Sequence, residues 1–299
     1  MLPEYFASRG FRAREVRSVD DAVAAVNASI ANSFVSLRFG PFDAAEHLNR
    51  YPEAAVGARV DGKPPEGSPA YALHDARTLS VSEAREATRN YYAWITAVDA
   101  HVGRLLSALE AQSLADSTAV VLAGLHGRHL GDLGLWGART NFESATRVPL
   151  IVSYPGQRAA GRETNALTEL ADLYPSICDI AGVGIPNGLH GSSFTPLFAD
   201  PDRLWKRAVF SQTPRTIPGV GEGVGRSMRT LRYRYTEWTA PGTPFKATEL
   251  YDYREDRLEK RNITASRKAQ SLVNGLAGIL AEGWRGSLPP TDPRSGASS

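Results

Sequence analysis

The stretch that most constrains the fold covers residues 118–155, because it holds two apolar runs on either side of a sharp break. The first run, residues 119–123, is rich in β-branched side chains and ends at Gly124, which is typical of a strand buried on both faces. The second run, residues 147–152, includes a proline and predicts another buried strand. Because ligands of open α/β sheets bind beyond the carboxyl ends of strands, we expect a site just after Gly124, at His126.

Length and composition bound the class of protein. A chain of 299 residues can form one large α/β domain, alone or with a smaller appendage. The net charge of +2 and the scattered arginines do not indicate a nucleic-acid protein. A single cysteine, Cys178, excludes an intrachain disulfide and a cysteine-based zinc site, and we expect it to be buried and inert. We find no apolar run long enough for a membrane span and no secretory signal, so the compartment stays open.

Hydrophobic periodicity places the other elements. Residues 80–113 form the longest expected helix, which Ser80 and Glu83 start with a capping box. Its apolar stripe is expected to face the core and consists of Tyr91, Ile95, Val98, Val102, Leu105 and Leu109. The remaining expected helices cover residues 2–15, 18–31, 167–183 (with a kink or break at Pro175) and 269–284, and the remaining strands residues 33–39, 227–238 and 249–252.

Two glycine-rich stretches are expected to be loops. Residues 59–78 are rich in Gly and Pro, and loops of this length are usually functional or mobile. Residues 219–225 carry several glycines but no Lys-Ser/Thr ending, so they do not indicate a phosphate-binding loop.

Residues 124–151 read GLHGRHLGDLGLWGARTNFESATRVPLI. This stretch resembles the sulfatase family of the alkaline-phosphatase-like superfamily, and within it the iduronate-2-sulfatase and choline-sulfatase branch, which reads SDHGxxLGEHGxWxKxxNFExATRVPLI. Further similar segments extend the resemblance from residue 2 to about residue 284, namely LPEYF, YYAWI, VGRLL, ELADLYP, GLHGSSF, SQTPR and ELYD.

The resemblance implies an α/β fold with a large mixed sheet between helices and a small C-terminal antiparallel sheet with one helix. We therefore predict a truncated sulfatase-like domain at residues 1–205, a C-terminal subdomain at 206–286 and a disordered tail at 287–299. In the family, the LPxYF segment follows the nucleophile motif CxPxR and the paired aspartates of the first strand. The family's N-terminal catalytic segment is therefore expected to be absent from this chain.

Three chemical positions of the family motif are apolar here. Leu125 stands where the family has a calcium-binding Asp, Leu133 where it has the His of EHG, and Ala138 where it has a sulfate-binding Lys. Sulfatases hydrolyse sulfate esters with a formylglycine hydrate as nucleophile, while calcium and Lys/His groups neutralise the sulfate oxygens; such electrostatic catalysis needs the whole constellation. We therefore predict no catalytic residue in this chain and expect neither calcium nor formylglycine in it.

The polar and aromatic residues left at this place form a residual pocket. Its predicted members are His126, Arg128, His129, Asp132, Trp136, Arg139 and Asn141. His126 is the residual metal candidate, but calcium takes six to eight oxygen ligands, so a lone histidine cannot hold it; the turn alone can also explain this histidine. Arg128, His129 and Arg139 either contact an anion or are solvated loop residues.

Three functions remain open. The first is a sulfatase-like protein without catalysis, and the second is part of an active calcium-dependent sulfatase acting on sulfated glycans or small sulfate esters. The third is a binding module for anionic glycans. The family strand that is expected to be absent would lie beside the strand ending at Leu125, so an open sheet edge is predicted to self-associate or to bind a partner strand.

Overall fold

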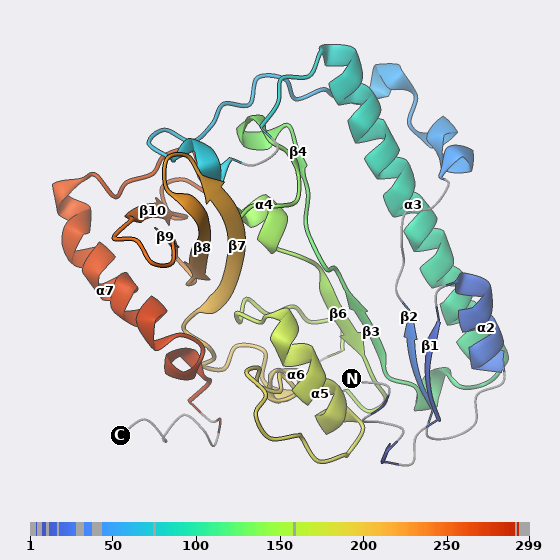
Figure 1. The fold of residues 1–299 in the computed structure, drawn as a ribbon. Coiled ribbons are helices and arrows are strands. Elements are labelled where there is room, and N and C mark those ends of the chain that lie inside the picture. Colours follow the sequence, from blue (N-terminus) through green and yellow to red (C-terminus); the bar gives the residue numbers. More distant parts are fainter. Residues whose placement is uncertain are drawn as a thin grey trace. The chain divides into compact units, whose positions relative to one another are not determined.

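The computed structural model of the chain describes residues 4, 8–9, 12–16, 18–27, 33–37, 44–73, 76–157, 160–290 and 292. The predicted mixed α/β class is confirmed, together with the C-terminal antiparallel sheet and its helix (Figure 1). No helix within the described residues combines the length and apolarity needed to cross a bilayer.

The described residues form the following helices and strands. The α-helices are α2 (Val19–Asn27), α3 (Val81–Ala111), α4 (Glu143–Thr146), α5 (Leu173–Ile180), α6 (Pro196–Ala199) and α7 (Gln270–Glu282). The strands are β1 (Arg12–Val16), β2 (Ser33–Leu37), β3 (Val120–Ala123), β4 (His129–Leu130), β5 (Trp136–Gly137), β6 (Leu150–Ser153), β7 (Val209–Ile217), β8 (Gly221–Arg229), β9 (Tyr233–Thr239) and β10 (Lys246–Asp252). The 3-10 helices are η1 (Ala45–Arg50), η2 (Glu53–Ala55), η3 (Ala70–Ala72), η4 (Ala115–Ser117), η5 (Asp132–Gly134), η6 (Leu170–Asp172), η7 (Arg267–Ala269) and η8 (Arg285–Ser287).

The chain forms two compact units that are not continuous in sequence. Unit 1 consists of Met1–Arg59, Leu79–Val120 and Val152–Gly156, and unit 2 of Val60–Thr78, Val121–Ile151 and Gln157–Ser299. Contacts rather than chain order define these units, so the predicted domain boundary between residues 205 and 206 stays a prediction.

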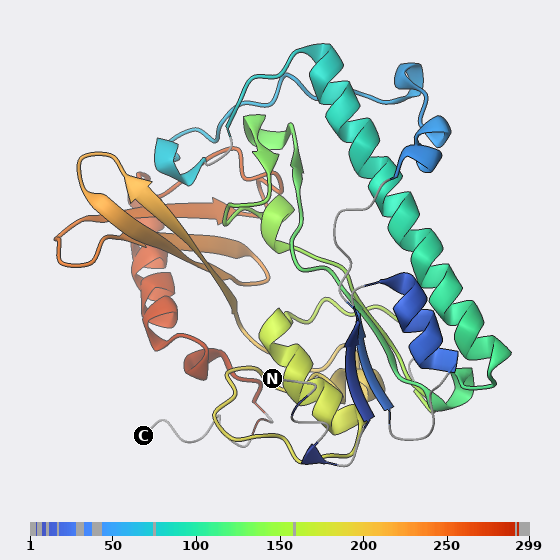
Figure 2. The ribbon, with the colours of Figure 1, turned by 45° about the vertical axis from the view of Figure 1, so that its right-hand side comes forward.

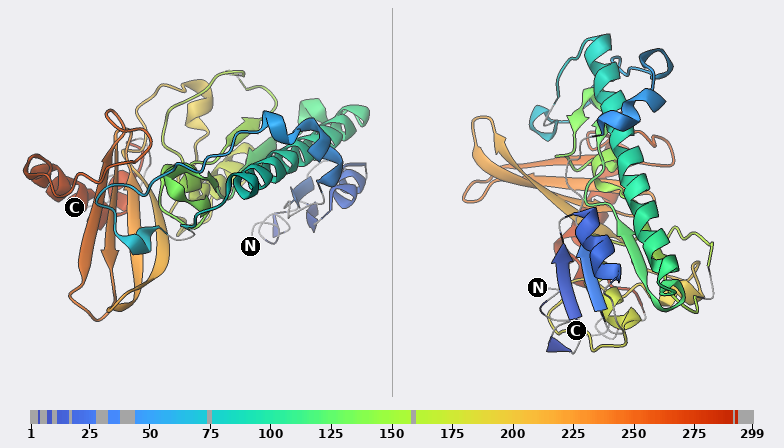
Figure 3. Two further views of the ribbon diagram at one scale, coloured as in Figure 1. Left: turned by 90° about the horizontal axis from the view of Figure 1, so that it is seen from above. Right: turned by 90° about the vertical axis from the view of Figure 1, so that its right-hand side faces the viewer.

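Unit 1 contains a parallel pair of strands and two helices. Strands β1 and β2 pair in register from Arg12 opposite Ser33 to Val16 opposite Leu37 (Figure 2). Helix α2 lies alongside α3 (Figure 3), where Arg104 on α3 forms an ion pair of 2.5 Å with Asp20 on α2. The helix predicted over residues 2–15 is therefore wrong at residues 12–15, where pairing with β2 overrides local helical propensity. Most of its earlier part lies outside the described residues.

Helix α3 confirms the predicted start but not the predicted core stripe. The Ser80 hydroxyl accepts a hydrogen bond from the Glu83 backbone, and the Glu83 carboxylate accepts one from the Ser80 backbone at 2.8 Å. In the predicted stripe, however, Ile95 is 52% exposed. Four small side chains of the helix are buried instead, namely Ala84, Thr88, Ala93 and Ala97. Small side chains let neighbouring segments approach the helix closely, and periodicity of apolar residues does not report this.

Unit 2 is built on a four-stranded antiparallel sheet in the order β10-β9-β8-β7. Helix α7 packs on this sheet (Figure 1), where Leu276 and Leu280 join the buried cluster of Met228, Tyr235 and Leu250. The strand predicted over residues 227–238 is two antiparallel strands, β8 and β9, joined by a turn. This sheet is the main core of the unit.

The glycine-rich stretch at residues 219–225 is mostly strand β8 rather than the predicted loop. A Cβ atom on Gly225 would lie 2.7 Å from the indole of Trp238 on β9. A side chain at this position would collide with the ring, so glycine here serves close packing across the sheet.

Three further predictions concern the helix at 167–183, Cys178 and the C-terminal tail. The helix predicted over residues 167–183 is the 3-10 helix η6 followed by α5, and Pro175 sits in the first turn of α5, where its missing N–H leaves no bond unmade. Cys178 on α5 is buried, as predicted. The predicted tail at 287–299 begins in a packed segment, because Ser287 and Leu288 are buried. Residues 291 and 293–299 lie outside the described part.

Candidate functional site

The candidate site lies in the loop that follows strand β3 in unit 2. Gly124 donates its backbone N–H to the Pro149 carbonyl at 2.9 Å, next to the pairing of β3 with β6. A Cβ atom on Gly124 would lie 2.9 Å from the Pro149 ring, and one on Gly127 would lie 2.1 Å from the Ser144 carbonyl. The turn therefore follows its neighbours so closely that only glycine fits at both positions.

The outer side of this loop exposes side chains to solvent. Leu125 is 50% exposed, and His126, Arg128 and Arg139 are exposed as well. Among residues that the structure describes, none of these three basic side chains has a hydrogen-bond or ion-pair partner. Among the described residues, the outer side thus presents two arginines, one histidine and one leucine, and no hydrogen bond or ion pair holds the three basic side chains in place.

The inner side of the loop is centred on His129, which is 1% exposed. Its Nδ1 lies 2.6 Å from Asp132 Oδ2 and its Nε2 lies 2.8 Å from Thr140 Oγ1. Asp132 also accepts a hydrogen bond from the Leu130 backbone at 3.0 Å. Burial alone would raise the pKa of Asp132, but hydrogen bonding and attraction by His129 outweigh it and lower this pKa to about 2. His129 therefore holds both ends of the short β4–β5 hairpin.

The predicted cationic cluster of Arg128, His129 and Arg139 is only partly brought together. Arg128 and Arg139 are exposed, whereas both ring nitrogens of His129 are engaged inside the protein. His129 is thus unavailable to an external anion in this structure. The position of Asp132 three residues after His129, across a turn at Gly131, is the sequence signal that could have indicated an internal pair.

Trp136 and Asn141, two other predicted pocket members, are buried scaffold residues. Asn141 donates from Nδ2 to the Gly225 carbonyl at 2.9 Å and accepts from the Thr213 hydroxyl at 3.0 Å. It ties the loop to strands β7 and β8. Leu133, which is compared above with the family's histidine, is buried against Leu135, Phe142 and Tyr251, so this side chain is part of the core.

A buried ionic network adjoins the loop, and sequence reasoning missed it. Arg234 on β9 donates to Glu143 at 2.5 Å and to Glu259 at 2.6 Å. Arg229 lies 3.2 Å from the same Glu143 carboxylate. Although burial raises the pKa of Glu143, attraction by Arg234 and Arg229 outweighs it and lowers this pKa. The network fixes the start of α4, near the end of the loop, to the C-terminal sheet.

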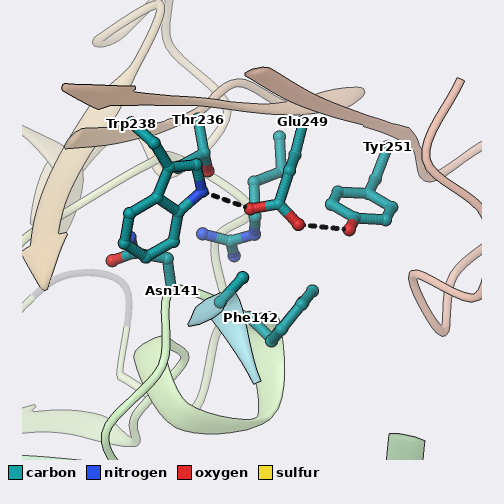
Figure 4. Close-up of a pocket in the computed structure, with 8 residues that line it drawn as sticks. Asn141, Phe142, Thr236, Trp238, Glu249 and Tyr251 are labelled. Carbon is teal, nitrogen blue, oxygen red and sulfur yellow. Dashed lines mark hydrogen bonds between the residues drawn. The ribbon is translucent and has the colours of Figure 1, made fainter. Parts of the chain in front are cut away.

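The pocket in Figure 4 lies inside this same part of unit 2 and leaves no room for a water molecule. Glu249 accepts hydrogen bonds from Trp238 at 2.7 Å and from Tyr251 at 2.8 Å. The lining residues are Ala72, Asn141, Phe142, Arg234, Thr236, Trp238, Glu249 and Tyr251. Because its polar side chains are hydrogen-bonded to one another or to neighbouring residues, it is a packed polar core rather than a ligand cleft.

The two side chains that follow β3 offer no oxygen ligand to a calcium ion. The Leu125 side chain has no ligand atom, and the His126 side chain offers nitrogen where calcium prefers carboxylate and carbonyl oxygen. No group of three or more His, Cys, Asp or Glu side chains in the described part of the chain is arranged to share a metal ion.

Two models of known protein families together match residues 42–283 of the chain. The family model described as "N-sulphoglucosamine sulphohydrolase, C-terminal" matches residues 131–283, and the model described as "Sulfatase" matches residues 42–183. This chain belongs to the sulfatase family. We call residues 124–147 the sulfatase signature loop. Residues 131–147 of this loop are matched by both models, and residues 124–130 by the "Sulfatase" model alone.

Curated relatives of the chain are sulfatases. The iduronate 2-sulfatase of Homo sapiens is 28% identical over 299 residues, which cover 73% of this chain and 54% of that protein. The choline-sulfatase of Rhizobium meliloti is 33% identical over 254 residues, which cover 81% of this chain and 46% of that protein. The chain thus spans about half the length of the curated relatives it matches.

Solved structures show the same fold. A protein solved in complex with its substrate D-glucosamine-2-N,6-O-disulfate matches with a TM-score of 0.71 at 19% identity, covering 93% of this chain and 70% of that one. A phosphonate monoester hydrolase from Silicibacter pomeroyi matches with a TM-score of 0.72 at 20% identity, covering 91% of this chain and 60% of that one. The alkaline-phosphatase-like fold predicted for this sulfatase-family chain is therefore confirmed.

Proposed function

We propose that this chain is a sulfatase-family scaffold whose signature loop no longer supports calcium-dependent hydrolysis of sulfate esters. The observation that carries the proposal is Leu125, half exposed at the end of β3 where the family has a calcium-binding carboxylate. Replacing aspartate by leucine removes a formal negative charge and an oxygen ligand from a cation that depends on both.

The other replacements act in the same direction. Ala138 cannot neutralise a sulfate oxygen as a lysine does, and Leu133 has joined the hydrophobic core. The loop is held instead by contacts within the protein, through His129 and Asn141. These contacts support the view that the protein itself holds the loop in place, without a bound ion or ester.

Calcium titration of the purified chain, followed by calorimetry and by the thermal unfolding midpoint, tests the metal part of the proposal. We expect no saturable heat and no shift of the midpoint at millimolar calcium. His126→Ala serves as the matched variant, because His126 is the exposed residual metal candidate. Saturable one-to-one binding to the wild type that His126→Ala removes would contradict the proposal.

A second candidate function, binding of an anionic glycan, is favoured by the exposure of Arg128 and Arg139 without acidic partners in the described structure. We expect salt-dependent retention on a sulfated polysaccharide that falls in Arg128→Ala/Arg139→Ala. Arg254→Ala/Arg257→Ala, at two other exposed arginines of unit 2, controls for the loss of two positive charges. Equal retention of all three proteins would remove this candidate.

A further inference from the structure

Residues 60–73 and 76–78, hereafter the strap, belong to the stretch 59–78 that is expected from its composition to be a functional or mobile loop. Within unit 2 it contacts the signature loop near both of its own ends and the C-terminal sheet in between. Residues 74 and 75 lie outside the described part. The remaining residues carry a series of contacts that links these two structures.

The first contact is a close approach of backbones at Gly62. A Cβ atom on Gly62 would lie 1.9 Å from the Gly131 carbonyl oxygen and 2.6 Å from the Gly134 backbone nitrogen. Gly131 and Gly134 both have positive φ, at 91° and 70°. The turn of the signature loop therefore presses directly on the strap, with no side chain between them.

The second contact lies near the other end of the strap. Ala76 forms an antiparallel bridge with Leu135, which is fully buried. Gly62 and Ala76 thus contact the same five-residue turn, Gly131 to Leu135, from two points of the strap.

Between these contacts, the strap is anchored on the segment that follows β10 and on the C-terminal sheet itself. Glu66 donates its backbone N–H to the Lys260 carbonyl at 2.8 Å and accepts from the Asn262 backbone at 2.8 Å. The Ser68 hydroxyl donates to the buried carboxylate of Glu249 on β10. The 3-10 helix η3 follows beside β7 (Figure 1), where Tyr71 packs edge-on against Trp238 with ring centroids 5.2 Å apart.

Arg215 on β7 joins the strap to the signature loop a third time. Its side chain is buried; Nε donates to the Tyr71 carbonyl at 3.0 Å and Nη2 donates to the Arg139 carbonyl. One guanidinium thus holds a backbone carbonyl of the strap and the backbone of an exposed arginine of the candidate site. The guanidinium fork is planar and rigid. A shift of Tyr71 therefore also displaces the Nη2 group of Arg215 that donates to the Arg139 carbonyl.

We propose that the strap is a conformational clamp, which fixes the signature loop from Gly131 to Arg139 when it is docked on the C-terminal sheet and releases that loop when it undocks. The presentation of Arg139 to solvent is then controlled from a segment about seventy residues earlier in the chain. The clamp goes beyond the proposed function, because the strap and residues 131–139 are coupled whether or not the site binds a ligand.

Hydrogen exchange followed by mass spectrometry on the full chain tests the clamp, with Gly62→Ala as the variant. The matched control is Gly57→Ala, since a Cβ atom on Gly57 meets nothing within 4 Å. We expect exchange in Gly62→Ala to be roughly 5- to 30-fold faster in both the strap and residues 131–139, with strands β7–β10 unchanged. Gly57→Ala is expected to exchange like the wild type.

A milder variant keeps the test decisive if Gly62→Ala fails to fold. Ser68→Ala removes only the hydroxyl that reaches Glu249, and we expect smaller increases in exchange in the same two segments. Faster exchange of the strap with unchanged residues 131–139, in either variant, would overturn the proposal. Equal acceleration throughout unit 2, β7–β10 included, would also overturn it, because that pattern reports global destabilisation.

Discussion

The C-terminal sheet and the outer side of the signature loop both carry charged residues, but they place them in opposite environments. On the sheet side, Arg234, Glu259 and Glu249 are almost completely buried and hydrogen-bonded. On the outer side of the loop, Arg128 and Arg139 are exposed. The buried charges support the fold, whereas the exposed ones have no such role, and Leu125 in the same loop is a half-exposed apolar side chain.

The largest expected effect lies on the buried side of this comparison. Arg234→Met leaves Glu143 and Glu259 without their shared cation, and breaking a buried ion pair costs about 3–5 kcal/mol of unfolding free energy. Arg139→Met, which also removes an arginine, is expected to change stability by less than about 0.5 kcal/mol. Urea denaturation of both variants measures the difference, and similar losses in the two would abolish the contrast.

The second prediction divides the signature loop itself. His129→Ala removes hydrogen bonds to Asp132 and Thr140 in a buried position and is expected to lower the unfolding free energy by about 1–3 kcal/mol. His126→Ala is expected to stay within about 0.5 kcal/mol of the wild type. Thermal or urea unfolding of the two variants distinguishes the inner from the outer side; a larger loss in His126→Ala would reverse the assignment.

The third prediction concerns pH and the same inner side. The folded-state pKa of Asp132 is lowered to about 2 from its ordinary value of 3.8. The stability that ionised Asp132 contributes is therefore fully present above about pH 4 and is lost as pH falls toward 2. Comparing unfolding free energies of the wild type and Asp132→Asn across this window is the measurement. We expect the two curves to converge toward acid; a constant gap would show that Asp132 carries no such linkage.

The smallest expected effect on stability concerns the exposed apolar residues. Ile151 is 60% exposed on β6 and Leu125 50% exposed after β3. We infer that this surface promotes self-association, so Ile151→Asp is expected to leave stability nearly unchanged and to lower the association state in sedimentation velocity. A wild type that remains monomeric at high concentration would contradict this inference.

Sequence patterns predicted elements whose signals are local. The capping box at Ser80 and Glu83, the helix α7 and the burial of Cys178 each follow from short-range chemistry, and the structure contains them. The motif around the signature loop was sufficient to predict the family and its fold.

The features that sequence reasoning missed depend on contacts between distant residues. His129 was grouped with Arg128 as a surface cation, because its partner Thr140 lies eleven residues away across a hairpin. Gly225 was assigned to a loop, because its reason for being glycine is Trp238 on the next strand. The sequence predicts only a loop for the strap for the same reason, since its partners lie about 60 to 195 residues further along the chain.

The most direct test of the central claim is sulfate-ester turnover by the purified chain, with and without calcium, using an aryl sulfate and a sulfated disaccharide. We expect no turnover above the level of a mock purification under either condition, because Leu125 and Ala138 supply neither the metal ligand nor the cation that the reaction needs. Calcium-dependent turnover that co-purifies with the chain and persists through further purification would contradict the claim and would show that the signature loop retains catalysis.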